Sequence, residues 1–128
     1  MRHDTVADVM SAIKNADRMG KRDCVTAASK LVKEVLTVMQ KEGYIGTFEF
    51  MDDGKSGKFK VELKSRVNDC NVIKPRYSVK IGEFEKWEKR FLPARDFGIL
   101  LVSTTKGLVT HEEAKKQKLG GKLLAYAF

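Results

Sequence analysis

The sequence predicts an α+β fold made of two small domains, and three patterns support this prediction. Two stretches in the first half place apolar residues at the spacing of an amphipathic helix. Other, shorter stretches alternate apolar and polar residues with period 2, as half-buried strands do. The stretch 65–71 is polar and separates the two halves. We therefore expect an N-terminal α-β-α-β-β domain over residues 1–66 and a mostly β C-terminal domain with short helices over residues 67–128.

Two helices are expected in the first half. The first runs from Asp4, which can cap it, to about Ala16, and Gly20 stops it. Its apolar stripe consists of Val6, Val9, Met10 and Ile13. A short strand over 24–26 follows, and Ser29 is the expected N-cap of a second helix that ends near Glu42, before Gly43.

A hairpin is expected next. Phe48 and Phe50 alternate with polar residues before the turn at 52–57, and Phe59, Val61 and Leu63 alternate after it. This pattern predicts that one face of the hairpin belongs to the core and that the other face is solvated. The phenylalanines are expected on the core face. The Gly-Lys-Ser at 54–56 is not a phosphate loop, because Glu49 stands where that motif needs glycine and a strand follows instead of a helix.

The second half is expected to begin with a strand over 73–81 whose outer face carries Lys74, Arg76 and Lys80. Pro75 places this strand at a sheet edge or at a strand start. A helix over 84–91 follows, and then a short buried strand over 99–102.

The last third is expected to contain a polar loop, a helix and a final strand. The loop covers Ser103, Thr104, Thr105, Lys106 and Gly107, after which 108–109 can resume the strand. Thr110 and Glu113 form a capping box that predicts a helix over 111–118, ended by Gly120 and Gly121. Residues 122–128 alternate as a terminal strand.

The composition indicates a polyanionic partner. The 128 residues include 25 Lys and Arg against 17 Asp and Glu, a net charge of +8. No run of five like charges occurs, so a basic surface has to be assembled by folding. No apolar stretch is long enough to span a membrane, and the N-terminus lacks a signal-peptide pattern.

Catalytic and metal sites are not favoured by the sequence. Neither His3 nor His111 has a nearby nucleophile motif, and Glu112 and Glu113 suit the first turn of a helix better than acid–base chemistry. Two cysteines 46 residues apart do not form the close ligand pairs of a zinc site. We therefore expect no enzyme activity, no metal and no cofactor.

A nucleic-acid surface is better supported. Ser103, Thr104 and Thr105 are small hydroxyl donors and acceptors that can reach bases, riboses and phosphates. Gly120 and Gly121 can let backbone N–H groups approach a ligand closely. The cations expected to neutralise phosphates around them are Lys74, Arg76, Lys80 and Arg95.

The residues resemble a known family. FGILLVSTTKGLVTHEEA at 97–114 and LGGKLLAY at 119–126 closely resemble the C-terminal signature of small-subunit ribosomal protein eight, the universal S-eight family. The first helix, the Ser-Lys-Leu at 29–31 and the segment 42–45 also match, so that the resemblance covers essentially the whole chain. The segments 73–77 and 92–98 resemble the archaeal and eukaryotic branch. The chain departs from the bacterial pattern at Thr5, Thr105 and Lys122, and Lys122 puts the bacterial contact at that position in doubt.

The resemblance implies a structural protein of the small ribosomal subunit in the cytoplasm. It implies direct binding to an irregular helix in the central domain of the small-subunit rRNA, early in assembly, next to other small-subunit proteins. The C-terminal contact residues carried over are Ser103, Thr104, Thr105, Gly120, Gly121 and Lys122, and Lys106 of the same polar loop is a further expected contact. The N-terminal surface carried over consists of Asp4, Thr5, Lys14, Asn15, Ser29 and Lys30. Regulation of the chain's own mRNA is a second hypothesis, and a small enzyme is a third.

Overall fold

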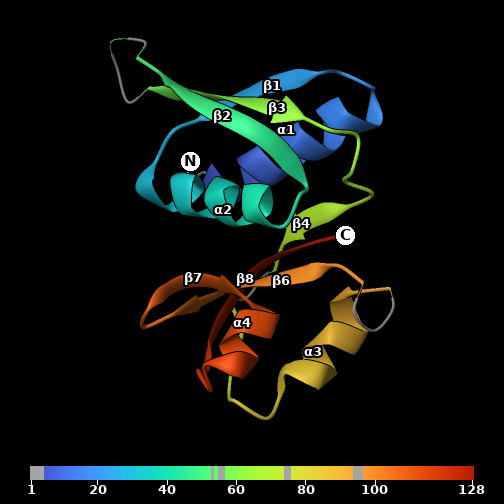
Figure 1. Ribbon diagram of the computed structural model, residues 1–128, viewed down its shortest axis with the longest axis vertical. Coiled ribbons are helices and arrows are strands. Elements are labelled where there is room, and N and C mark those ends of the chain that lie inside the picture. Colours follow the sequence, from blue (N-terminus) through green and yellow to red (C-terminus); the bar gives the residue numbers. More distant parts are fainter. Residues whose placement is uncertain (1–4, 53, 55–56, 74–75, 94–96) are drawn as a thin grey trace. The chain divides into compact units, whose positions relative to one another are not determined.

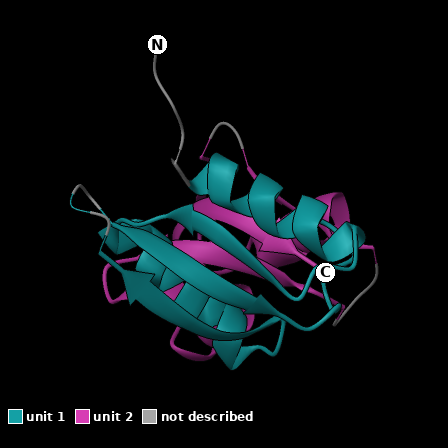
Figure 2. Ribbon diagram, turned by 90° about the horizontal axis from the view of Figure 1, so that it is seen from above, with its two compact units in different colours: residues 1–69 teal, residues 70–128 magenta. Residues whose placement is uncertain are grey.

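The computed structural model describes the chain except residues 1–4, 53, 55–56, 74–75 and 94–96. The chain divides into two compact units, residues 1–69 and 70–128 (Figure 2). Each unit combines helices with one antiparallel sheet, so the predicted α+β class is confirmed.

The first unit has the predicted α-β-α-β-β order. Its elements are α1 (Thr5–Arg18), β1 (Asp23–Ala27), α2 (Lys30–Lys41), β2 (Ile45–Met51) and β3 (Lys58–Leu63). The strands form an antiparallel sheet in the order β1-β3-β2. Both helices lie on the same side of this sheet (Figure 1).

The core of the first unit lies between the helices and the sheet. The predicted apolar stripe of α1 is buried, and α2 buries Val32, Val35, Leu36 and Met39. The N–H of Val32 donates to the Ser29 hydroxyl oxygen over 3.1 Å, which confirms the predicted N-cap. The sheet contributes alternate residues of β3, namely Phe59, Val61 and Leu63.

The prediction that Phe50 belongs to the core is wrong. Its side chain is 59% exposed, and Phe48 is only partly buried. The alternation correctly identifies the helix-facing side of β2, but a hollow beside the start of α2 leaves this end of the sheet uncovered. Period-2 patterning gives the face of a strand and not how far the covering helices extend along it.

The second unit is built around the C-terminal strand. Its elements are β4 (Cys70–Val72), β5 (Ser78–Val79), α3 (Phe84–Phe91), β6 (Ile99–Thr104), β7 (Gly107–Thr110), α4 (His111–Lys116) and β8 (Gly121–Ala127). The sheet order is β4-β8-β6-β7, and β5 also pairs with β8. The predicted helix over 84–91 and the predicted terminal strand are confirmed.

Of the strand predicted over 73–81, the described residues form only the short strand β5, and another short strand, β4, lies just before the predicted range. Cys70–Val72 pairs with one end of β8, and Ser78–Val79 pairs with the other end. The strand β4 begins inside the polar stretch 65–71, where Cys70 is buried and pairs with Ala127 of β8. Both strands lie at the edge of the sheet, as predicted, although Lys74 and Pro75 are outside the described residues.

Two further predictions about the C-terminal third are wrong. Residues 103–107 are not a loop, since β6 continues through Thr104 and β7 begins at Gly107, which leaves a two-residue turn of Thr105 and Lys106. The helix α4 ends at Lys116 and not at the glycine pair. It is closed by Lys118 in the left-handed conformation (φ 56°) and by the Leu119 N–H, which donates to the Ala114 carbonyl.

The helix side of the second sheet is covered by a small aromatic core. Trp87 of α3 stacks on Tyr77, with ring centroids 4.5 Å apart, and on Phe91 at 6.2 Å. Phe91 in turn stacks on Tyr126 of β8 at 5.7 Å. These contacts fix α3 against the strand that runs through the middle of the sheet.

Candidate nucleic-acid interface

The predicted hydroxyl residues lie at the tip of the β6–β7 hairpin. Ser103 is the penultimate residue of β6, Thr104 is the last, and Thr105 and Lys106 form the turn. Ser103, Thr105 and Lys106 are exposed. The hairpin therefore presents two hydroxyls and one ammonium group to solvent within four residues.

Thr104 differs from its neighbours, because its hydroxyl is used inside the turn. The hydroxyl donates to the carbonyl of Gly107 over 2.8 Å and accepts the N–H of Lys106 over 3.2 Å. These bonds close the two-residue turn and hold its backbone in one conformation. The structure therefore gives Thr104 a structural role, whereas the Ser103 side chain bonds to no other described residue.

The sheet extends the hairpin tip into a row of polar side chains. Ser103 of β6 pairs with Lys122 of β8, and Lys122 pairs with Ser78 of β5. Residues directly opposite in antiparallel pairs point to the same face, so the three side chains stand side by side. All three are exposed. We call Ser78, Lys122 and Ser103 the polar row.

The glycine pair allows neighbouring strands of the sheet to approach closely. A side chain at Gly121 would collide with the carbonyl oxygen of Ser103, and one at Gly120 would stand 2.7 Å from the carbonyl oxygen of Val79. Strands β5, β8 and β6 come together closely here only because both positions lack a Cβ. The glycines thus place Lys122 between its two serine neighbours.

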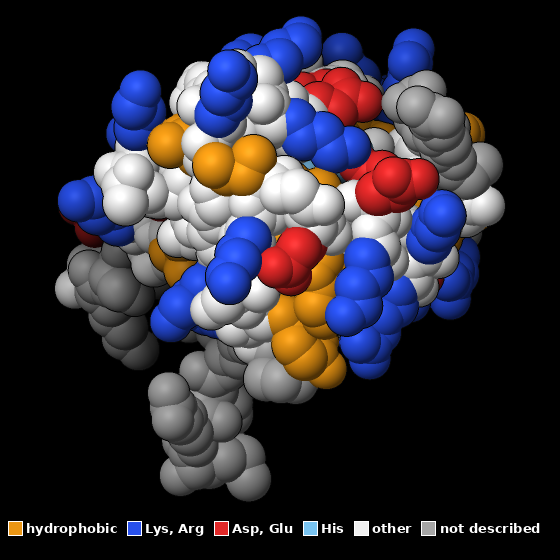
Figure 3. Space-filling view, turned by 90° about the horizontal axis from the view of Figure 1, so that it is seen from below, with side chains coloured by type: hydrophobic (Ala, Val, Ile, Leu, Met, Phe, Trp, Pro, Cys, Tyr) orange, Lys and Arg blue, Asp and Glu red, His pale blue; other side chains and the backbone are white. Residues whose placement is uncertain are grey.

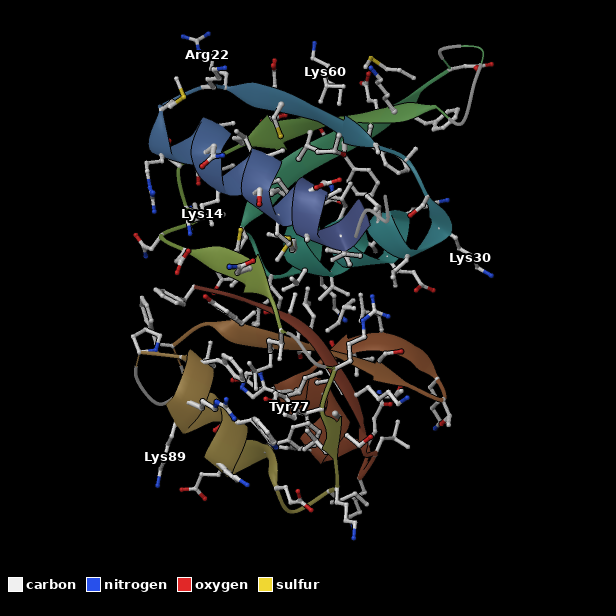
Figure 4. All side chains as sticks on the ribbon, turned by 180° about the vertical axis from the view of Figure 1, so that it is seen from behind. Lys14, Arg22, Lys30, Lys60, Tyr77 and Lys89 are labelled. Atoms are coloured by element: carbon white, nitrogen blue, oxygen red, sulfur yellow. The ribbon has the colours of Figure 1, made fainter. Side chains whose placement is uncertain are left out.

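The residues predicted for the first unit have mixed surroundings. Lys14 forms a 2.7 Å ion pair with Asp69, and next to it Asp17 accepts the N–H of Val67 over 2.8 Å, so this end of α1 binds the segment after β3. The Ser29 hydroxyl is engaged in capping α2. Lys30 extends away from the unit at the start of α2, as Figure 4 shows. Asn15 is exposed as well.

Asp4, Lys74 and Arg95 lie outside the described residues, as does the side chain of Thr5. Arg76 and Lys80 are described and exposed. Figure 3 shows a face of the molecule on which Lys and Arg side chains are spread widely and Asp and Glu side chains are few.

His111 is a buried polar residue whose contacts with the strand β6 of the hairpin the sequence does not reveal. His111, 2% exposed, accepts the N–H of Leu100 at Nδ1 over 3.1 Å. Its Nε2 lies 3.2 Å from a carboxylate oxygen of Glu88, which also pairs with Lys115. His111 thereby connects α4, β6 and α3, and its ring is not available to a molecule at the surface.

Comparison with known proteins identifies the family. A family model described as "Ribosomal protein S8" matches residues 4–128. The chain belongs to the ribosomal protein S8 family. It is also 52% identical over 126 residues to the "Small ribosomal subunit protein uS8" of Methanococcoides burtonii. The aligned residues cover 98% of this chain and 97% of that protein.

For a member of the S8 family, the structure adds Ser78 to the residues that sequence reasoning proposed. Ser78 alternates with Tyr77 and Val79, a pattern that places it on the outer face of a strand. Its proximity to Lys122 depends on the register between β5 and β8, which one sequence does not reveal.

Among the described residues, no group of three or more His, Cys, Asp or Glu side chains is arranged to hold a metal ion. None of the described helices is long and apolar enough to cross a membrane.

Proposed function

We propose that this S8-family chain is a structural constituent of the small ribosomal subunit and that it binds the rRNA of the subunit directly. Its family membership and its similarity to a protein named for the small ribosomal subunit support this role. The observation that carries the RNA contact is the polar row beside the hairpin tip, where two hydroxyls flank an ammonium group.

The chemistry of the polar row suits an irregular RNA helix. Regular A-form RNA hides its base edges in a deep, narrow groove, whereas internal loops expose bases and riboses. Ser103 and Ser78 can each donate and accept hydrogen bonds, and Lys122 can neutralise a phosphate between them. The irregular helix is in the central domain of the small-subunit rRNA, as the sequence resemblance implies.

The protein acts by binding and not by catalysing a reaction. A surface serine needs a base within hydrogen-bond reach to become a nucleophile. His111 is buried and directed at Glu88 and the Leu100 N–H, and so it does not serve Ser103 as a base. The protein works on the cytoplasmic ribosome, where it contacts neighbouring small-subunit proteins and supports subunit assembly.

The test compares two RNAs with the purified protein. One is a central-domain helix with its internal loop, and the other is the same helix made fully complementary. We expect the intact loop to bind at least about tenfold tighter, the scale of one or two lost hydrogen bonds. Equal affinity for both RNAs would contradict recognition of the loop.

A matched variant separates the polar row from general attraction. Lys89 is exposed on α3 and is not part of the polar row. Lys89→Ala should leave the preference for the internal loop unchanged, whereas Ser103→Ala should reduce it. A footprint on the protein's own mRNA with the same dependence on Ser103 would extend the function to translational regulation.

A further inference from the structure

One aromatic ring on the first unit is exposed and yet firmly held. Phe50, at the end of β2, is 59% exposed. Its ring lies against Gly57, where a Cβ would collide with it, and meets the ring of Phe59 edge to face with centroids 5.9 Å apart. Phe48 also meets the ring of Phe59 edge to face, with centroids 5.5 Å apart. A ring held in this way loses little conformational entropy when a ligand stacks on it.

The ring borders a hollow of about 550 Å³, which we call the Phe50 hollow. Phe48, Phe50 and Phe59 supply its apolar wall. Lys30 and Lys33, one turn apart in α2, also line the hollow at its rim, and both lysines are exposed. No carboxylate belongs to the described residues that line it.

Aromatic rings beside lysines match the two parts of a nucleotide. A base stacked on an aromatic side chain contributes binding without sequence preference, because every base has a π face. Its phosphate needs a nearby cation. An apolar side chain of a neighbouring protein could also pack against the phenylalanines, but it would leave the ammonium groups of Lys30 and Lys33 without a partner. The charge of the rim therefore favours RNA.

We propose that the Phe50 hollow binds one unpaired RNA nucleotide, with its base on Phe50 and its phosphate on Lys30 and Lys33. This contact rests on the proposed role in rRNA binding and adds a second recognition point, on the first unit. Lys30 is expected from the sequence resemblance, whereas Phe50 and Lys33 follow from the structure alone.

The test uses the full chain and a transcript of the rRNA central domain that contains 4-thiouridine. Ultraviolet crosslinking should join the RNA to the peptide that carries Phe50. Phe50→Leu keeps an apolar side chain and removes the π face, and we expect affinity to fall about 5- to 50-fold. Phe50→Trp should restore it. Lys33→Ala should weaken binding and reduce its salt dependence.

The control is a variant of an exposed aromatic ring that lies outside the Phe50 hollow. Phe97→Leu removes another exposed ring, 48% exposed and located in the second unit, and should leave affinity unchanged. Unchanged affinity of Phe50→Leu, or no crosslink to its peptide while the wild type binds, overturns the Phe50 hollow but leaves the polar row intact. Loss of subunit assembly with unchanged RNA affinity would assign the hollow to a protein partner and also overturn the proposal. Failure of the wild type to bind would instead contradict the proposed function itself.

Discussion

The carbonyl group of Ser103 occupies the space beside Gly121 that a side chain would need. This relationship ties the exposed end of β6 to the start of β8, one residue before Lys122. The position of the polar row thus depends on a residue that has no side chain. Substitution at Gly121 should affect the fold first and RNA binding through it.

Gly121→Ala should destabilise the second unit by about 1–3 kcal/mol, the usual cost of adding a methyl group where no space exists. Gly82→Ala is the matched control, because a Cβ there meets no atom within 4 Å. Urea unfolding followed by fluorescence can measure both, since the chain's one tryptophan, Trp87, is buried in the second unit. Equal stability of the two variants would contradict the close contact.

Ser103→Ala and Thr104→Ala should separate binding from stability. The Ser103 hydroxyl is exposed and bonds to no described residue, so its loss should weaken RNA binding by about 1–2 kcal/mol and leave unfolding unchanged. Thr104 closes the turn through two hydrogen bonds, so its loss should lower stability by about 1 kcal/mol.

Filter binding and urea unfolding of the same two proteins would check this separation. Thr105→Ala extends the series, because Thr105 is exposed at the turn and should behave like Ser103. A fall in stability without a change in affinity for Ser103→Ala would place the RNA contact elsewhere.

Lys122→Ala should reduce the salt dependence of RNA binding. Each phosphate contact contributes about one unit to the slope of log affinity against log salt concentration. Lys122 is exposed and stands between Ser78 and Ser103, so we expect the slope to fall by about one. Lys89→Ala on α3 should leave it unchanged. The same slope in both variants would mean that Lys122 faces solvent in the complex.

Local signals in the sequence predict the elements well and their partners poorly. Ser29 caps α2 as expected because a cap depends on residues three positions apart. Phe50 was expected in the core because alternation gives the face of a strand, while its exposure depends on where α2 begins. Gly120 and Gly121 look like a helix stop, and yet their contacts are with Val79 and Ser103, far along the chain. The sequence predicts Ser103 and Lys122 but does not reveal Ser78 beside them, since the polar row follows from the registers of three strands.

The thiol of Cys24 in β1 should make stability fall in alkaline solution. Partial burial, together with the negative charges of Asp23 and Asp17, raises the pKa of Cys24 from 9.0 to about 11. Between these values the unfolded chain releases the thiol proton more readily than the folded chain does. Stability should therefore be unaffected below about pH 8 and decrease as the pH rises from about 9 to 11.

Cys24→Ala removes this titration and provides the comparison. The free energy of unfolding of the wild type, relative to that of Cys24→Ala, should stay constant between pH 6 and pH 8. It should fall between about pH 9 and pH 11, the interval between the pKa of the thiol in the unfolded chain and its pKa in the folded chain. Cys70 is present in both proteins, so its contribution cancels. Because the thiolate is the nucleophile, iodoacetamide should also modify Cys24 at pH 7 more slowly than an unperturbed thiol. A constant difference at every pH, with a normal rate of alkylation, would show that Cys24 ionises in the folded protein as it does in the unfolded chain.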